Sequence, residues 1–189
     1  MASLLIGLGN PEARYAGNRH NIGFMAVDRV AEDYAFAKWS LKFGGAVAEG
    51  NIGAEKVFAF KPLKYMNLSG TPAAEIANFY KIPLEKIIVI HDELDLPLGK
   101  LRVKRGGGSG GHNGLKSLDA HLGADYLRVR LGIDRPADKD DVSNFVLSDF
   151  AKAEMPKVET ILAETSRHIG LLLASDEAGF MNKVSLAVQ

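Results

Sequence analysis

Short apolar runs that stop at turn-forming or polar residues recur along the chain. The run from Ser3 to Leu8 ends at Gly9-Asn10-Pro11, a pattern that predicts a buried strand followed by a turn. The aliphatic, β-branched block from Lys86 to Ile90 predicts a strand buried on both faces. It runs directly into His91-Asp92-Glu93. Two strands are therefore expected to carry polar side chains at their carboxyl ends.

Four further segments have strand character and are bounded by turn signals. They are Gly45–Ile52, Val57–Phe60, Leu101–Lys104 and Tyr126–Leu131. The first two flank the turn region Asn51–Gly53 and are predicted to pair. The last alternates apolar residues with Arg128 and Arg130, which predicts a strand with one face exposed to water. Both arginines are expected to share that face.

Helical patterns alternate with these strands. Apolar spacing from Ile22 to Tyr34 predicts an amphipathic helix directly after Arg19-His20-Asn21. Thr71 followed by Pro72 supplies an N-cap and a first-turn proline, so a helix is predicted over Pro72–Tyr80. The remaining predicted helices are Gly114–Leu122, Lys152–Leu173, which allows for a break near Pro156, and Asp176–Val184. The alternation predicts one α/β domain over residues 1–189, a three-layer α/β/α sandwich around a twisted mixed sheet.

Composition excludes several classes of protein and site. The 189 residues are 47% apolar and 24% charged, as in an ordinary globular domain. Absence of cysteine excludes disulfide scaffolds, thiolate zinc sites and cysteine nucleophiles. The N-terminal sequence lacks the basic region of a signal peptide, and no apolar run has the length of a membrane span. We therefore expect a cytoplasmic protein without a membrane partner.

Charge is balanced overall but unevenly distributed. Lys plus Arg and Asp plus Glu both number 23, so the net charge gives no nucleic-acid signal. Residues 134–141 and the C-terminal third lean acidic, whereas basic residues gather in two predicted strands and beside them. The basic residues are Lys100, Arg102, Lys104, Arg105, Arg128 and Arg130. A local basic face is compatible with this pattern.

Five polar segments fall at predicted strand ends and helix starts, where ligands of open α/β sheets bind. They are Gly7-Leu-Gly-Asn10-Pro, Arg19-His20-Asn21, Tyr65-Met66-Asn67-Leu-Ser-Gly, His91-Asp92-Glu-Leu-Asp-Leu-Pro and Gly106-Gly-Gly-Ser-Gly-Gly-His112-Asn113-Gly. In this order and at these separations they resemble the motif set of bacterial-type peptidyl-tRNA hydrolases, over nearly the whole chain. Glu12 and Asn18 depart from the glycine and threonine that the resemblance leads one to expect, which affects only the local loop shape.

The resemblance implies a monomeric esterase that needs no metal, no cofactor and no obligate protein partner. It would cut the ester between the peptide and the 3′ ribose of peptidyl-tRNA. By resemblance His20 is the general base and Asp92 its partner, while Asn10 and Asn67 orient substrate and water. Asn113 would bind the peptide carbonyl and the tetrahedral intermediate. The resemblance further implies substrate contacts at Tyr15 and Met66, and tRNA contacts at Arg102, Lys104 and Arg130.

The residue types fit that chemistry. A histidine with an unperturbed pKa of about 6.5 is largely neutral at neutral pH and can accept a proton from water. A carboxylate on its other ring nitrogen fixes the tautomer and stabilises the imidazolium. Taken alone, His20 also suits a surface position or a helix cap, and Asp92 suits a turn cap. A contact between His20 and Asp92 separates the two interpretations. Asparagine amides can donate to a developing oxyanion without titrating.

Other functions fit less well but remain open. Gly107-Gly-Ser109-Gly-Gly111 matches the Gly-x-Ser-x-Gly nucleophile pattern, which makes a Ser109-dependent esterase the rival mechanism. A noncatalytic RNA-binding module would rest on the basic strand residues alone. A P-loop lacks its adjacent Gly-Lys-Ser, and a dinucleotide site lacks glycine at position 12. Strand alternation splits Asp92, Glu93 and Asp95 between two faces, which disfavours a metal site.

Overall fold

A single mixed sheet forms the centre of the protein, as seen in a computed structural model that describes residues 2–188. The ends of the expected domain, residues 1 and 189, lie outside the described part. The sheet has seven strands in the order β2-β3-β4-β1-β5-β7-β6. The strands are β1 (Ser3–Gly7), β2 (Ser40–Lys42), β3 (Gly45–Ile52), β4 (Glu55–Pro62), β5 (Ile87–Glu93), β6 (Leu101–Arg105) and β7 (Leu127–Gly132). The central strands β4, β1, β5 and β7 are parallel, and the outer pairs are antiparallel.

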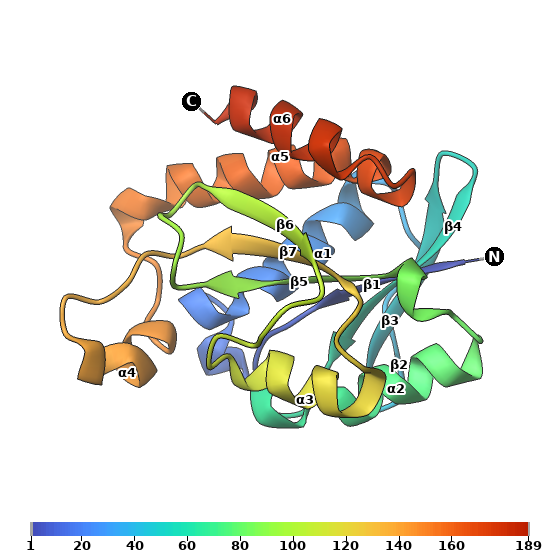
Figure 1. Cartoon of the computed structure of the whole chain (residues 1–189), viewed down its shortest axis with the longest axis horizontal. Helices are drawn as coiled ribbons and strands as arrows, with labels where there is room; N and C mark the ends of the chain where they lie inside the picture. Colours follow the sequence, from blue (N-terminus) through green and yellow to red (C-terminus); the bar gives the residue numbers. More distant parts are fainter. Residues whose placement is uncertain (1, 189) are drawn as a thin grey trace.

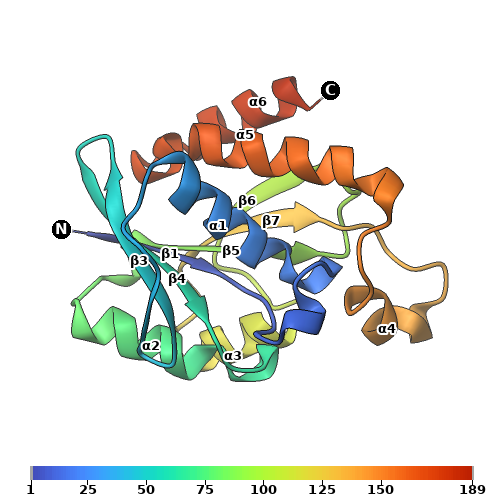
Figure 2. The ribbon, with the colours of Figure 1, turned by 180° about the vertical axis from the view of Figure 1, so that it is seen from behind.

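Helices cover both faces of this sheet, so the predicted three-layer sandwich is confirmed (Figures 1 and 2). The helices are α1 (Ile22–Asp33), α2 (Gly70–Phe79), α3 (Asn113–Leu122), α4 (Val142–Val146), α5 (Met155–Leu173) and α6 (Glu177–Ala187). One core lies between the sheet and α1, α5 and α6; the other lies beneath α2 and α3. Along β5, Ile88 and Ile90 enter the first core, while Ile87 and Val89 enter the second. Each face of the buried strands is therefore apolar, as the aliphatic run predicts.

Close backbone packing brings the start of α1 onto the strand ends. A Cβ at Gly23, in the first turn of α1, would collide with the carbonyl oxygen of Ile90 and lie 2.7 Å from backbone atoms of Leu8. Only glycine allows this approach. The approach fixes the turn before α1, which contains His20, beside the carboxyl ends of β1 and β5.

Several element boundaries differ from the sequence prediction. Helix α2 begins at Gly70, and Thr71 is therefore inside it and not its N-cap. The Gly70 N–H donates to the Ser117 hydroxyl at 2.8 Å, a long-range cap that no local pattern reveals. The helix predicted over Lys152–Leu173 is divided just before Pro156, into a 3-10 turn at Lys152–Glu154 and helix α5 from Met155; the proline lies in the first turn of α5, where its missing N–H costs nothing. Strand β2 and helix α4 were not predicted, since both are very short.

The prediction of a water-exposed face on β7 is wrong at Arg128. Arg128 and Arg130 do share a face and Arg130 is partly exposed, but α3 and the glycine loop cover Arg128, which is only 2% exposed. Its guanidinium donates to the carbonyl oxygens of Gly107 and Gly108 at 3.1 and 3.0 Å and to Asp119 at 3.1 Å. It also lies 4.6 Å from the Tyr126 ring centre. Backbone and side-chain acceptors thus bind the Arg128 guanidinium in place of the solvent that the alternating pattern had predicted.

None of the helices within residues 2–188 combines the length and apolar character needed to cross a bilayer.

Candidate active site

The five polar segments converge at one end of the sheet, on the side from which α4 projects (Figure 1). Asn10 follows β1, and Asp92 lies near the end of β5. His20 comes from the short turn before α1, and Asn113 opens α3. The convergence follows from the parallel order of β1 and β5, which places their carboxyl ends side by side.

Asp92 lies between two imidazoles. His20 Nδ1 is 2.7 Å from Asp92 Oδ2, and His112 Nε2 is 2.6 Å from Asp92 Oδ1. The predicted contact between His20 and Asp92 is therefore present. Asp92 is 3% exposed, so both of its oxygens are occupied by ring N–H donors away from bulk water. Sequence reasoning had given His112 no role.

The tautomer of His112 is set by the helix that follows it. Its Nδ1 accepts the backbone N–H groups of Gly114 and Leu115 at 3.0 and 3.3 Å, so the ring is the N-cap of α3. The ring proton must then lie on Nε2, the atom that faces Asp92. Histidine is an unusual N-cap, and the sequence pattern therefore did not indicate this arrangement.

The same hydrogen bonds bear on metal binding. His20, Asp92 and His112 form a group with three ligand atoms within 4.8 Å of one another. A metal ion on His112 Nε2 would require the ring proton to sit on Nδ1, where two backbone N–H groups point. The group is thus arranged for hydrogen bonding between rings and carboxylate, and its donor set does not fit a metal ion.

The electrostatics of the group favour a basic His20. Burial lowers the pKa of His20, but the charge of Asp92 and the hydrogen bond to it outweigh burial, so the pKa is raised above its ordinary value. Burial alone would raise the pKa of Asp92, whereas the two imidazoles hold it well below its usual range. Asp92 therefore stays ionised while His20 takes up a proton.

His91 lies on the opposite face of β5 from Asp92, as the strand alternation predicts. Its ring packs edge-on against His112 with 5.3 Å between ring centres, and Nδ1 donates to the Asp92 carbonyl at 2.8 Å. Burial, followed by the nearby His112, lowers the pKa of His91 to about 3. His91 is consequently a neutral packing residue at neutral pH.

The three asparagines differ in how much of each amide is free. Asn10 Oδ1 accepts the Met66 N–H at 2.8 Å, and the Asn10 backbone is held by both amide atoms of Asn21 at 2.8 and 2.9 Å. Within residues 2–188 the Asn10 amide nitrogen has no hydrogen-bond acceptor, which leaves it available to a ligand. Asn67 and Asn113 are exposed and line the same cavity as Asn10.

Two cavities meet at His20. The first, of about 330 Å³, is bounded by the three asparagines, Met66 and Leu147. The second, of about 290 Å³, is bounded by Asp92, the tip of the glycine loop and Arg135. Ser143 and Val146 of α4 line both. We call the first the asparagine cavity and the second the loop cavity.

A third, smaller cavity of about 90 Å³ continues from the loop cavity toward the basic strands. Lys104 and Arg130 line it, and Arg130 Nε is bound to Glu93 at 2.8 Å. Arg102 is exposed on β6 and lines none of these three cavities. Tyr15 likewise lines none of them, and instead lies beneath the Arg14 guanidinium, 4.6 Å from its ring centre. The structure thus brings together eight of the ten predicted site residues and leaves Arg102 and Tyr15 at the margin.

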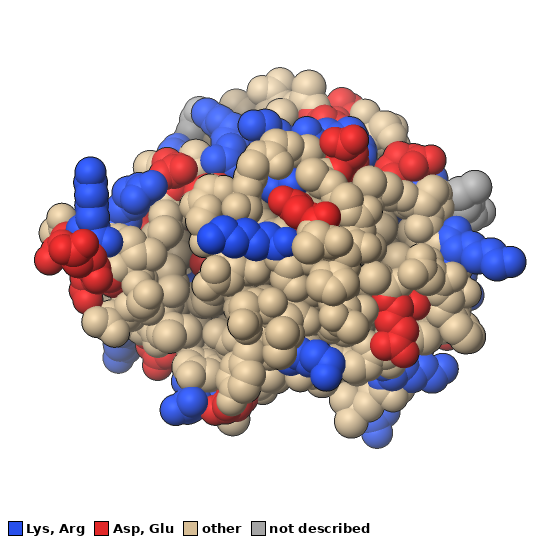
Figure 3. All heavy atoms as spheres, turned by 60° about the horizontal axis from the view of Figure 1, so that its bottom comes forward, with Lys and Arg blue, Asp and Glu red and all other residues tan. Residues whose placement is uncertain are grey.

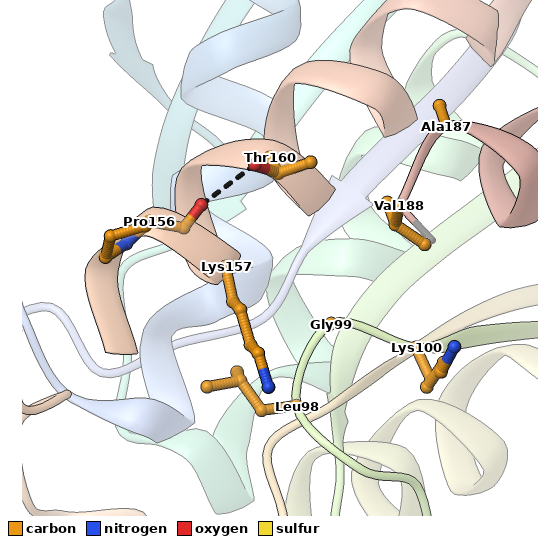
Figure 4. Close-up of a pocket in the computed structure, with 8 residues that line it drawn as sticks. All are labelled: Leu98, Gly99, Lys100, Pro156, Lys157, Thr160, Ala187 and Val188. Atoms are coloured by element: carbon orange, nitrogen blue, oxygen red, sulfur yellow. Dashed lines mark hydrogen bonds between the residues drawn. The ribbon is translucent and has the colours of Figure 1, made fainter. Parts of the chain in front are cut away.

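The face of the molecule in Figure 3 carries no concentrated patch of one charge. The face in Figure 3 is largely uncharged, with blue and red atoms in small separate groups. A larger cavity of about 440 Å³ lies between the β5–β6 connection and α5 and α6 (Figure 4). It contains neither a histidine nor a carboxylate, and its Thr160 hydroxyl already donates to the Pro156 carbonyl at 2.9 Å. The chemistry therefore belongs to the cavities at His20.

Ser109 lies at the tip of the glycine loop and lines the loop cavity. Among the described residues its hydroxyl forms no hydrogen bond with His20 or His112, whose nitrogens facing Asp92 are already engaged. The loop leaves β6 and does not follow the end of a buried parallel strand, unlike a nucleophile elbow. The rival mechanism through Ser109 thus lacks its base.

Sequence and structure comparisons give one consistent result. A family model described as peptidyl-tRNA hydrolase matches residues 4–189. A peptidyl-tRNA hydrolase of Chelativorans sp. (strain BNC1) is 54% identical over 98% of this chain and 78% of the relative. One from Rhodopseudomonas palustris (strain BisB18) is 52% identical over 98% of this chain and 92% of the relative. A crystal structure of peptidyl-tRNA hydrolase from Acinetobacter baumannii, at 37% identity, superposes with a TM-score of 0.92 over 97% of this chain and 94% of that one.

Proposed function

The chain belongs to the peptidyl-tRNA hydrolase family and hydrolyses peptidyl-tRNA; we propose that water activated by His20 makes the attack. The observation that carries this mechanism is the His20–Asp92 contact of 2.7 Å. With its Nδ1 proton directed to Asp92, the neutral ring has its lone pair on Nε2. That nitrogen is the acceptor for a proton of the attacking water.

In this scheme the proton that His20 takes from water is later given to the ester oxygen that leaves. Water adds to the carbonyl carbon of the ester while Nε2 of His20 takes its proton. The tetrahedral intermediate then expels the 3′ ribose oxygen, which receives the proton from the His20 imidazolium. Asp92 stabilises that imidazolium without itself becoming protonated, in agreement with its lowered pKa.

Amide donors near His20 suit the negative charge that develops on the carbonyl oxygen. The Asn10 amide nitrogen is the donor left free by the bond from Met66, and Asn113 adds an amide at the N-terminus of α3. A helix N-terminus itself favours negative charge. We assign Asn10 and Asn67 to orientation of substrate and water, and Asn113 to the peptide carbonyl and the intermediate. An oxyanion donor such as Asn113 is worth about 3–4 kcal/mol in a transition state.

The positions of the cavities indicate which part of the substrate each cavity binds. The basic residues Lys104 and Arg130 line the small cavity that adjoins the loop cavity. We therefore assign the loop cavity to the 3′ end of the tRNA and the asparagine cavity, with Met66, to the peptide. Contacts from Arg102, Lys104 and Arg130 would hold phosphates without reading bases. Tyr15 is proposed as a contact at the outer edge of the peptide path.

We further propose a monomer that works in the cytoplasm. All residues assigned to the site come from one chain, which supports a monomer without an obligate protein partner. The cytoplasmic assignment rests on the substrate, because peptidyl-tRNA arises during translation. No cofactor is assigned, since water and the side chains named above supply every step.

Release of a labelled acyl-peptide from purified peptidyl-tRNA tests the mechanism. We expect turnover by the native chain and by Ser109→Ala, unaffected by a chelator. In His20→Ala, kcat should fall by about 10²- to 10⁴-fold, the usual contribution of a general base. An unchanged kcat in His20→Ala would contradict the proposed mechanism. Loss of turnover in Ser109→Ala alone would favour a serine nucleophile, and binding without turnover by the native chain would favour an RNA-binding module.

A further inference from the structure

Helix α4 forms a wall of the substrate cavities although it has little packing of its own. It comprises only Val142–Val146 and contains no buried residue. Its residues Ser143 and Val146 nevertheless line both the asparagine cavity and the loop cavity. In Figure 2 it projects from the body of the molecule, away from α5. Isolated helices of this length are unstable in water, so something outside the helix must fix its position.

The side chain of Arg19 makes several of the contacts that attach α4. Its Nη1 donates to the Ser148 hydroxyl at 2.6 Å and to the Asp149 carbonyl at 2.7 Å, while Nη2 donates to Glu154 at 2.6 Å. The guanidinium also lies 4.4 Å from the ring centre of Phe145, the penultimate residue of α4. Arg19 is only 9% exposed. One buried side chain thus joins the end of α4 to the segment that leads into α5.

Main-chain bonds hold the same two segments in register. The Arg19 N–H donates to the Ser148 carbonyl at 3.0 Å, and the Phe150 N–H donates to Gly17 at 3.2 Å. Arg19 immediately precedes His20. The wall of the cavities and the proposed base are therefore attached to one short turn.

We propose that Arg19 is a positioning residue that fixes the α4 wall of the substrate cavities relative to His20. Its planar guanidinium donates hydrogen bonds to acceptors in three different residues and stacks on an aromatic ring at the same time. A lysine keeps the charge but offers one nitrogen and no stacking plane, so it cannot hold this set. The main-chain bonds and the His20–Asp92 contact do not depend on the guanidinium. Loss of the Arg19 guanidinium should therefore make α4 more mobile and leave His20 in place.

The first test compares Arg19→Lys with the native chain by steady-state kinetics on peptidyl-tRNA. We expect KM to rise by about 10- to 100-fold, as misplaced binding groups do, with kcat changed less than about threefold. The midpoint of the pH profile should not move, because His20 keeps Asp92. Arg29→Lys is the matched control, since Arg29 forms an exposed pair with Asp33 on α1 and should leave KM unchanged. A lowered melting temperature with a native KM would overturn the proposal.

Amide hydrogen exchange gives a second readout that does not need turnover, which matters because the kinetic test rests on the proposed function. Residues 142–150 should exchange faster in Arg19→Lys, while α1 stays protected. Unchanged exchange in residues 142–150 would overturn the proposal, whereas faster exchange in a chain without turnover would overturn only the proposed function. If Arg19→Lys does not fold, Ser148→Ala removes one acceptor of the guanidinium, together with the hydroxyl bond from Ser148 to the Phe145 carbonyl, and should raise KM and local exchange in the same direction. A native KM and native exchange in Ser148→Ala would then overturn the proposal.

Discussion

His112 donates from Nε2 to Asp92 Oδ1 at 2.6 Å, on the oxygen that His20 does not use. The rings of His20 and His112 lie 5.1 Å apart, centre to centre, with the carboxylate between them. One buried anion is thus held by two imidazole N–H donors, of which one ring is fixed by a helix N-terminus and the other faces the cavity. This division makes the roles of the two histidines experimentally separable.

Asp92→Asn should move the activity profile to lower pH. Asp92 raises the His20 pKa above its ordinary value, whereas burial acts in the opposite direction. Without the negative charge only burial remains, so the pKa should drop below about 6.5. The acidic limb of kcat/KM, which reports the free enzyme, should follow it, and kcat should fall because the imidazolium loses its stabilising charge. Asp28→Asn, on the exposed side of α1, is the control, and a limb that stays in place in Asp92→Asn would contradict the assignment.

Two substitutions at His112 should separate its two contacts. Serine is a good N-cap but cannot reach Asp92 in place of the ring, whereas alanine loses both contacts. We expect kcat to fall similarly in His112→Ser and His112→Ala, because each removes a donor from Asp92. Only His112→Ala should lose an additional increment of about 1 kcal/mol in the free energy of unfolding, measured in urea. Native kcat in His112→Ser would show that the ring acts only as a cap.

Asn10→Asp should remove a donor without removing a structural acceptor. An aspartate keeps an oxygen for the Met66 N–H but has no amide nitrogen for the substrate. We expect kcat to fall by about 10²-fold, as when the substrate or the attacking water is misplaced. Asn10→Ala should show a similar kcat and, in addition, lose about 1–3 kcal/mol of stability, because the Met66 N–H would be buried without a partner. Full kcat in Asn10→Asp would exclude the donor role.

The order of elements and most of the site could be predicted because they depend on local sequence. Apolar runs of strand length and polar residues after them identify β1 and β5, and parallel pairing then brings Asn10 and Asp92 together. The role of His112 could not be predicted in the same way. Its contacts depend on how closely α3 approaches β5, and histidine is rarely chosen as a cap. The pattern Gly-Gly-His-Asn-Gly at a helix start was the one available signal.

The error at Arg128 has a different origin. Alternation along β7 correctly places Arg128 and Arg130 on one face, but it carries no information on what covers that face. The cover consists of α3, whose Asp119 is 9 residues from Arg128 in sequence, and of backbone carbonyls of the glycine loop, which are about 20 residues away. Arg130, two residues further along, lies beyond this cover and remains partly exposed. The same alternation therefore produced one buried and one accessible arginine.

Arg128 should consequently be required for stability. Removing a partner from a buried, hydrogen-bonded ion pair costs about 3–5 kcal/mol, because the remaining groups stay desolvated. Arg128→Ala would leave Asp119 and the carbonyls of Gly107 and Gly108 without this donor. We expect the urea midpoint to fall by a corresponding amount and the glycine loop to become sensitive to proteolysis. Arg102→Ala, on the exposed side of β6, is the control, and equal midpoints for the two variants would contradict the buried role.

Salt dependence should identify which basic residues contact phosphate. Each phosphate contact that a cation makes releases counterions, so it adds about one to the slope of log KM against log salt concentration. Lys104→Ala and Arg130→Ala should each reduce this slope by about one while kcat changes little. Arg102 lines none of the site cavities and its guanidinium is near its own strand, bonded to the Leu101 carbonyl at 3.3 Å, so Arg102→Ala should have a smaller effect. Lys38→Ala, before the opposite edge strand β2, should leave the slope unchanged. Equal slopes for Lys104→Ala and Lys38→Ala would mean that the tRNA follows a path away from β6 and β7.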